Sequence, residues 1–394
     1  MVSLPLAAMV LFLGQIAGAE PIPFPSSYQR FVNDTSSSVL VAYQQEQRER
    51  MIQLINRDPL IARKVLISFL RQPDKLDVAR SVAELFPQSC ELELEKPFFD
   101  FFVAAGPELR KRVLDSVERI TDAEYERSHS HSSDRFDDLM RDRALSYLQQ
   151  AAAELQAMGF ADGEAYSHSR WAMYKSRWPD NDFGLEGLEK ARVLYEKSGN
   201  LRGQAYCLLQ SALRHRNRSL GKLDQATPLF LQACEIGKNE GSPILGHFLS
   251  RYSWLAPKSS VEWLKESTEL IEKDPALRRT RYEMLLRDDT PVEKYQALLE
   301  EEADPVHKTR ALFDLYRNLS DNDRQTQALE AVNSAIELAR RQEYDMAVYG
   351  RGFFPAVPWM LNERAQSKMQ LGMLREAESD CLEALQLLEQ ESSL

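Results

Sequence analysis

The sequence predicts an all-α protein, built as a solenoid of antiparallel helical hairpins. Between positions 208 and 335 an apolar column recurs every 34 residues, at Phe230, Leu264, Leu298 and Val332. The columns three places later and four places earlier hold mainly alanine and serine. A constant period of this length is typical of stacked helical hairpins. Glycine is scarce, at 16 of 394 residues, which argues against many strands and tight turns.

Helix starts are marked independently of this period. A capping side chain followed by proline occurs at Ser242-Pro243, Asp274-Pro275, Thr290-Pro291 and Asp304-Pro305. Proline is favoured at the first helical position, because the N–H that it lacks has no partner there. The resulting helices, of about 13 residues, are joined by short turns that force neighbours to run antiparallel. The repeat domain is expected to cover residues 139–394.

The first 19 residues have the composition of a cleaved signal peptide. Residues 4–16 are apolar and uncharged, and the small residues Ala17, Gly18 and Ala19 follow them. The apolar run, of about 13 residues, is shorter than the roughly 20 needed to span a bilayer. A buried N-terminal helix and a retained anchor are the alternatives. We therefore expect cleavage after Ala19 and a mature protein that is periplasmic or secreted and does not span a membrane.

Three segments are expected between the signal peptide and the repeats. Residues 20–37 contain three prolines and a serine run, which predict an extended leader. Residues 38–123 are expected to form a small helical unit, with helices at 41–56, 60–71, 76–86 and 107–120. Its aromatic stretch, residues 97–102, is interpreted as core, with an exposed docking patch as the alternative. Residues 124–138 lack apolar periodicity and are expected to be a linker.

Residues that could bind a metal or form disulfides are dispersed. His129 and His131 lie two places apart, but no third ligand follows at a recognisable spacing, so no metal site is predicted. None of the four cysteines is in a CxxC motif. Cys207 and Cys234 would lie on the two helices of one hairpin. A disulfide between them and two buried free thiols are both left open.

Two rows carry the spacing of a known repeat family. The row from Leu213 to Ala233 has a glycine in its turn and small or aromatic residues at fixed places of its second helix, namely Gly221, Ala226, Phe230 and Ala233. The last hairpin repeats this pattern with Gly372, Ala377, Cys381 and Ala384. With these residues the chain resembles a tetratricopeptide-repeat (TPR) protein over positions 140–391. The resemblance implies a concave groove lined by the first helix of each hairpin.

Other rows depart from the family pattern. Large residues stand where the family prefers a small one, at Arg214, Phe248, Tyr282 and Tyr316, and Glu301 stands in place of an alanine. Exported arrays of this kind also resemble the input regions of bacterial signalling enzymes. The sequence shows no output domain of the cyclase, kinase or protease type.

Composition and motifs argue against several classes of function. A formal net charge of −11 is unsuited to nucleic acid or anionic lipid, which need clustered Lys and Arg. The sequence has no Gly-rich phosphate loop, nucleophile elbow or HExxH motif. We therefore predict a protein that is not an enzyme and that needs no cofactor.

Arginine and lysine are distributed differently between the expected first helices and the rest of the repeats. The expected first helices, 207–220, 241–254, 275–288 and 309–322, carry ten basic residues, all arginine, and four acidic ones. The rest of the four rows carries ten basic residues, seven of them lysine, and seventeen acidic ones. Arginine binds carboxylates and phosphates through two parallel hydrogen bonds, whereas lysine acts as a point charge.

This bias predicts a partner-binding groove. Matched to the family place by place, the groove-lining residues are Arg218, Arg279, Arg287, Arg310, Arg317, His215 and Tyr252. They are expected to clamp an acidic peptide segment or a chain-terminal carboxylate. The alternative is that these arginines pair with carboxylates of neighbouring helices and only hold the stack together. Arg214 is expected to be structural, because its place faces the adjacent helix.

The sequence thus favours a non-catalytic exported scaffold or adaptor that binds a protein or peptide in its groove. The alternative is a ligand- or protein-sensing input module, which would act with a separate membrane output protein in an envelope signalling system.

Overall fold

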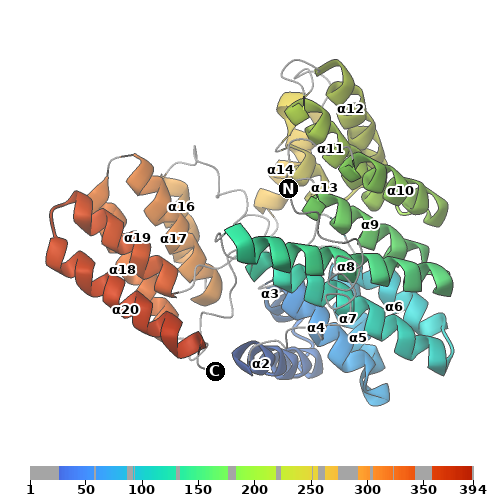
Figure 1. Ribbon diagram of the computed structural model, residues 1–394, viewed down its shortest axis with the longest axis horizontal. Coiled ribbons are helices and arrows are strands. Elements are labelled where there is room, and N and C mark those ends of the chain that lie inside the picture. The colour runs from blue at the N-terminus through green and yellow to red at the C-terminus, as the bar shows by residue number, and fades with distance from the viewer. Residues whose placement is uncertain are drawn as a thin grey trace, which may run out of the picture. The chain divides into compact units, whose positions relative to one another are not determined.

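The computed structural model describes residues 26–56, 59–86, 92, 94–129, 134–175, 183–218, 223–250, 252–255, 262–273, 292–301, 305–322, 324–341 and 357–392. Every regular element within these ranges is helical, which confirms the all-α prediction (Figure 1). No helix in the described ranges is long and apolar enough to cross a membrane.

The described residues fall into two compact units, which are treated separately below. The central unit consists of residues 66–273, and the terminal unit combines residues 26–65 with residues 292–392. The expected linker, 124–138, therefore lies inside the central unit rather than at a boundary.

The N-terminal helices of the structure differ from those expected. They are α2 (Ser26–Gln44), α3 (Arg48–Asn56) and α4 (Pro59–Leu70). The prediction of an extended leader is wrong from Ser26 onward, because the serine run does not break the helix. The hydroxyls of Ser36 and Ser37 donate to the carbonyls four residues earlier, at 2.8 and 3.0 Å. The single helix expected at 41–56 is divided at Glu46, whose φ is 55°.

The first helices of the central unit enclose the aromatic stretch. They are η1 (Pro73–Lys75), α5 (Leu76–Leu85), α6 (Glu95–Ala104) and α7 (Pro107–His129). Phe98, Phe99 and Phe102 of α6 are at most 5% exposed, so the prediction that this stretch is core is confirmed. The ring of Phe101 stacks on that of Phe160, with centroids 4.6 Å apart.

The expected linker is largely helical. Helix α7 continues to His129, and α8 (Asp134–Met158) begins five residues later. Ala123 and Tyr125 are buried, and their burial explains why α7 continues past the predicted end at Ile120. The side chain of His129 and all of His131 lie outside the described residues.

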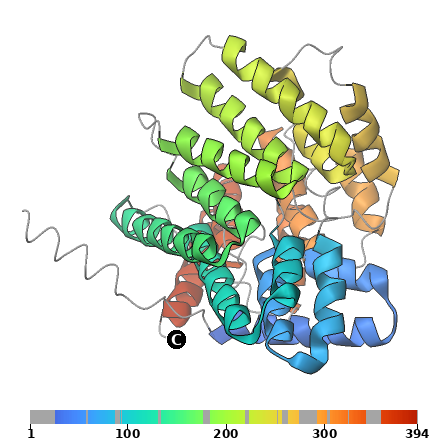
Figure 2. The same cartoon turned by 90° about the vertical axis from the view of Figure 1, so that its right-hand side faces the viewer.

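Helices α9 to α14 pack against one another in chain order, as both views show (Figure 1, Figure 2). They are α9 (Ala161–Lys175), α10 (Phe183–Ser198), α11 (Leu201–Arg218), α12 (Leu223–Glu240), α13 (Pro243–Ser250), with η3 (Ser253–Leu255), and α14 (Glu262–Lys273). The two-residue connection between α10 and α11 uses Gly199 at φ 77°, a left-handed conformation that costs glycine little. The start of α13 at Pro243 confirms one of the proline-marked starts.

The terminal unit continues the same construction. Its hairpin helices are α16 (Val292–Glu301), α17 (Pro305–Asp321), α18 (Gln325–Arg341), α19 (Val357–Gln370) and α20 (Leu374–Ser392). Helix α17 begins at Pro305 as predicted. The other two starts, at 275 and 291, lie outside the described residues. Gly372, at φ 75°, forms the turn between α19 and α20.

The periodic columns are buried where the structure describes them. Ala226, Phe230 and Ala233 of α12 have no exposed surface, and neither do their counterparts in α18, Ala328, Val332 and Ala335. Leu264 and Ser267 of α14 are at most 6% exposed. The side chain of Leu298 lies outside the described residues. The 34-residue period therefore marks the positions at which the second helix of a hairpin meets its neighbours.

First helices of successive hairpins also contact each other. Arg214 of α11 donates from Nη2 to the carbonyl of Ala172 in α9, at 3.0 Å, which confirms its structural role. Burial lowers the pKa of Arg214 to about 10. Tyr206 of α11 stacks on Phe248 of α13, and in the terminal unit Phe313 of α17 meets Trp359 of α19. At these places large side chains fill the space between first helices.

Cys207 and Cys234 are buried free thiols in this structure. Burial raises the pKa of both thiols, that of Cys234 to about 12. Both therefore behave as small apolar side chains of the α11–α12 hairpin.

The close approach of α13 and α14 generates a testable prediction. A Cβ added at Gly246 would lie 2.5 Å from Cβ of Ser267, which belongs to one of the periodic columns. Gly246→Ala should therefore lower the free energy of unfolding by about 1–2 kcal/mol, because overpacking outweighs the better helix propensity of alanine. Urea denaturation followed by circular dichroism measures this.

Gly184→Ala is the comparison, since Gly184 also lies in a helix, α10, but the nearest atom to a Cβ there, Nε of Arg214, is 3.2 Å away, so the loss of stability should be smaller. Equal stability of the two variants would show that α13 and α14 do not depend on the missing side chain.

Candidate protein-binding surface

The predicted groove residues belong to both units. His215, Arg218 and Tyr252 lie in the central unit, and Arg310 and Arg317 lie on α17 of the terminal unit. Arg279 and Arg287 are outside the described residues, as is the side chain of Arg218, at the end of α11. His215 is half-buried on α11.

The two arginines of α17 differ in their surroundings. Arg310 donates from Nε to Oδ2 of Asp314 at 2.7 Å, and its side chain is 13% exposed. Arg317 is exposed and forms no ion pair or hydrogen bond with any described residue. Arg310 therefore pairs with a carboxylate, as in the alternative in which these arginines only hold the stack together. Arg317 has its guanidinium available to a ligand.

The carboxyl of Asp314, which lies between these two arginines in the sequence, has a raised pKa. Its side chain is 7% exposed, and burial raises its pKa to about 6, although Arg310 and Arg317 both favour the charged form. Desolvation therefore raises the pKa of Asp314 by more than the two neighbouring arginines lower it.

A row of four aromatic side chains runs from α11 through α13 to η3. Tyr206 stacks on Phe248 at 5.8 Å between centroids, Phe248 meets Tyr252 edge-on at 5.7 Å, and Tyr252 meets Trp254 at 6.5 Å. We call these four residues the aromatic row. The first two are buried, whereas Trp254 in η3 is 46% exposed. The row therefore leads from the core to an exposed indole.

Arg216 covers that indole. Its Cζ lies 3.5 Å from the centroid of the Trp254 ring, within the range of a cation–π contact. Arg216 is exposed, and no described carboxylate pairs with it. A guanidinium stacked by its face keeps its N–H edges free, and these edges match a carboxylate. Arg216 and Trp254 thus form a preorganised cationic site.

Another arginine of the central unit is already neutralised. Arg170 of α9 forms an ion pair from Nε to Oε1 of Glu124 on α7, at 2.7 Å, and donates from Nη2 to the hydroxyl of Tyr166 at 3.0 Å. The Tyr166 hydroxyl donates in turn to Glu124 at 2.9 Å. Burial alone would lower the pKa of Arg170, but Tyr166 and Glu124 hold it well above its usual range. This cluster joins α7 to α9 and leaves no charge for a ligand.

A hollow of about 690 Å³ lies at the turns of the central unit. Asp162 in its wall has a pKa raised by burial, and it accepts hydrogen bonds from Asn200 at 2.8 Å and Ser198 at 3.0 Å. Arg202 and Glu240, which also line the hollow, pair at 2.9 Å. Because these groups satisfy one another, the hollow offers a ligand less than the Arg216–Trp254 site.

Arg216 and Trp254 were not among the sequence-predicted groove residues. Arg216 was included in the arginine bias of the first helices, but the family register assigned the groove to His215 and Arg218 instead. Trp254 lies beyond the end of α13, in a 3₁₀ turn that the period does not mark. Tyr252, which was predicted, connects to both through the aromatic row.

Within the described ranges, no group of three or more His, Cys, Asp or Glu side chains is placed to hold a metal ion. A comparison with models of known protein families gives no match, and neither does a comparison with curated protein sequences.

The acidity of Asp314 predicts a pH-dependent stability. Its folded-state pKa, about 6, exceeds the ordinary 3.8, so the folded state favours the protonated form. The stabilisation from this proton is fully present below pH 3.8 and is lost as the pH rises through 6. Between pH 7.5 and pH 5, the free energy of unfolding of the unmodified protein should therefore rise by about 1.4 kcal/mol relative to Asp314→Asn.

Urea denaturation at the two pH values measures this difference. Asp321→Asn, an exposed carboxyl on the same helix, is the control and should follow the unmodified protein. If the free energy of unfolding of Asp314→Asn changes with pH as much as that of the unmodified protein, the pKa of Asp314 is not raised by folding.

Proposed function

We propose that this chain is a TPR-type scaffold without catalytic activity, which binds an acidic segment of a protein partner along its first helices. The observation that carries the proposal is the exposed Arg216 stacked on Trp254 at the end of the aromatic row. An aromatic face and an unpaired guanidinium together fit a peptide that carries both apolar and carboxylate side chains.

The packing of the hairpins supports the repeat assignment. Second helices bury the small and aromatic columns of the 34-residue period, and first helices of successive hairpins contact each other through Arg214 and Tyr206. Both features are expected of a TPR-like solenoid, in which each hairpin packs on the next. The groove of such a solenoid would be lined by the first helices.

The arginine bias supports a negatively charged ligand. Arg310 and Arg170 are neutralised by Asp314 and Glu124, so they do not contribute to ligand charge recognition. Arg216 and Arg317 remain unpaired by described carboxylates. At either of these arginines, taken separately, an acidic segment gains charge-assisted hydrogen bonds, whereas a basic one would be repelled.

The proposed compartment is the periplasm or the cell exterior. It rests on the apolar residues 4–16 and the small residues 17–19, which lie outside the described residues. An exported scaffold would meet its partner in an envelope process.

A fluorescent peptide of alternating Glu and Leu residues tests the binding proposal by anisotropy. Arg216→Gln should weaken its binding to the full chain about tenfold, because a charge-assisted hydrogen bond is lost. Trp254→Leu should weaken it similarly by removing the surface on which Arg216 is held, while Trp254→Phe should keep most of the affinity. Arg317→Glu tests the terminal unit in the same way.

Arg341→Gln is the matched control, because Arg341 is also exposed but pairs with Glu337 on its own helix. Its affinity should be unchanged. If Arg216→Gln and Trp254→Leu fold normally by circular dichroism and bind as tightly as this control, the acidic-ligand proposal is wrong.

A further inference from the structure

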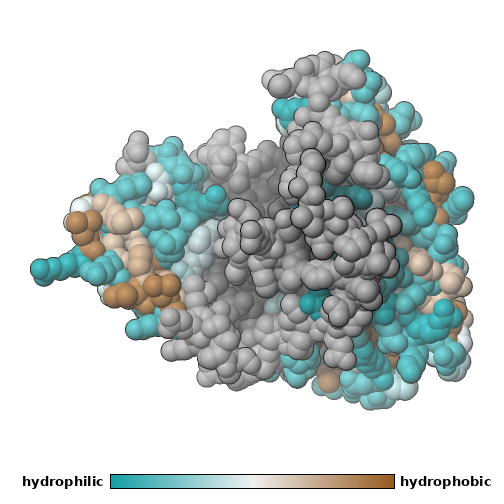
Figure 3. Space-filling view, viewed as in Figure 1, coloured by the Kyte–Doolittle hydropathy of each residue, from teal (hydrophilic) through white to brown (hydrophobic). Residues whose placement is uncertain are grey.

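Exposed apolar side chains gather on the last described hairpin. Ten large hydrophobic side chains are more than a third exposed in the described ranges, and six of them lie between positions 369 and 385. These six are Met369, Leu371, Met373, Leu374, Leu382 and Leu385. Figure 3 shows hydrophobic side chains over this hairpin, at the left of the view. Single exposed leucines are ordinary, but a cluster of this size marks an interaction surface.

The repeat register shows which face of α20 carries them. Ala377, Cys381 and Ala384 of α20 correspond to Ala328, Val332 and Ala335 of α18, each 49 residues earlier. In the same register, Leu382 and Leu385 take the positions of Asn333 and Ile336. The face of α20 that exposes leucine is therefore equivalent to one specific face of α18.

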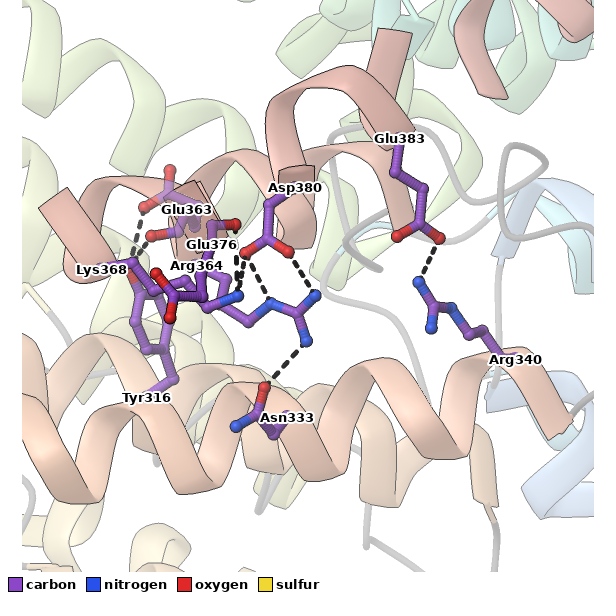
Figure 4. A network of polar contacts seen from close by, with 9 residues as sticks. All are labelled: Tyr316, Asn333, Arg340, Glu363, Arg364, Lys368, Glu376, Asp380 and Glu383. Atoms are coloured by element: carbon purple, nitrogen blue, oxygen red, sulfur yellow. Dashed lines mark hydrogen bonds and ion pairs between the residues drawn. The ribbon is translucent and has the colours of Figure 1, made fainter. Parts of the chain in front are cut away.

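On α18 that face receives the next hairpin. Asn333 accepts a hydrogen bond from Nη1 of Arg364 on α19 at 2.8 Å, and Ile336 is 1% exposed (Figure 4). Arg340, one turn beyond Ile336, pairs with Glu383 of α20. Leu382 and Leu385, at the equivalent places of α20, are 55% and 56% exposed. Leu385 is thus exposed at the place where Ile336 of the preceding hairpin is covered, and Leu382 takes the place of Asn333, which is exposed but hydrogen-bonded to the next hairpin.

Helix α20 is held firmly against α19 on its other side. Asp380 is 5% exposed and accepts from Arg364 at 2.6 Å and from Lys368 at 2.7 Å (Figure 4). Both hydrogen bonds and ion pairs favour its charged form, and the pKa of Asp380 is lowered despite burial. This anchor fixes the orientation of α20, so its leucines form a preorganised face.

The charges around this face indicate what covers it. Helix α20 contains six acidic residues and one basic residue, Arg375. Glu378 is exposed and lies one helical turn from both Leu374 and Leu382. A second copy of this helix would bring like charges together, whereas a helix with basic side chains beside its apolar stripe would pair with them.

We propose that the leucine face of α20, formed by Leu374, Glu378, Leu382 and Leu385, docks a basic amphipathic helix of a partner protein, stacked as a further helix of the array. The partner supplies an apolar stripe to the three leucines and a Lys or Arg to Glu378. This proposal is independent of the acidic-ligand site in the central unit.

The probe is a synthetic amphipathic helix of leucine and lysine with 19 residues, the length of α20, and its binding to the full chain is measured by isothermal titration calorimetry. The double variant Leu382→Gln/Leu385→Gln should weaken binding at least tenfold, and Glu378→Lys should weaken it further. Leu270→Gln is the matched control, because Leu270 of α14 is 54% exposed but lies in the other unit. Arg216→Gln should bind this probe like the unmodified chain.

Three outcomes would overturn the proposal. The first is equal binding of the probe to the double variant and to Leu270→Gln. The second is equal affinity for a leucine–glutamate helix of the same length, which would show that charge plays no part. The third is a concentration-dependent dimer in sedimentation velocity that the double variant abolishes, which would assign the face to a second copy of this chain.

Discussion

The close approach of the two helices in each hairpin is the constraint on which the rest of this fold depends. The backbone of Gly246 in α13 lies so close to Ser267 of α14 that it leaves no room for a side chain, and Ala233, the residue of α12 equivalent to Ser267, has no exposed surface. A single helix of this length cannot bury its apolar stripe alone, so each hairpin depends on small residues inside it and on a neighbour outside it. Large residues such as Phe230 then fill the space between hairpins.

The same constraint explains which parts were predictable from the sequence. The columns at Phe230 and Val332 repeat with the hairpin, so their period predicted their burial, and proline starts marked Pro243 and Pro305. Residues 26–37 and 124–129 were misjudged, because α2 contains local hydrogen bonds of serine hydroxyls and α7 buries Tyr125, and neither feature leaves a periodic signal. For the candidate site, the sequence indicated arginine on a first helix but not the contact of Arg216 with Trp254, because that contact joins a helix to a 3₁₀ turn that no repeat pattern marks.

Pairing of buried charges separates structural arginines from those that remain available. Arg170, Arg310 and Arg364 each have a carboxylate that is at most 7% exposed, and breaking such a pair would leave that carboxylate buried without a countercharge. Position in the repeat alone does not distinguish them from Arg216 and Arg317. What distinguishes them is the carboxylate of a neighbouring turn or helix, which is visible in the sequence only where, as for Arg310 and Asp314, the two lie four residues apart.

The two proposed surfaces select ligands of opposite charge. The Arg216–Trp254 site favours carboxylates, and the acidic rim of α20 would repel the ligand that this site binds. Likewise, a basic helix suited to Glu378 gains nothing from a stacked guanidinium. The two proposed surfaces would therefore distinguish two partners by the sign of their charge, in a chain whose net charge is −11. A scaffold needs this property, because partners that competed for one surface could not be held together.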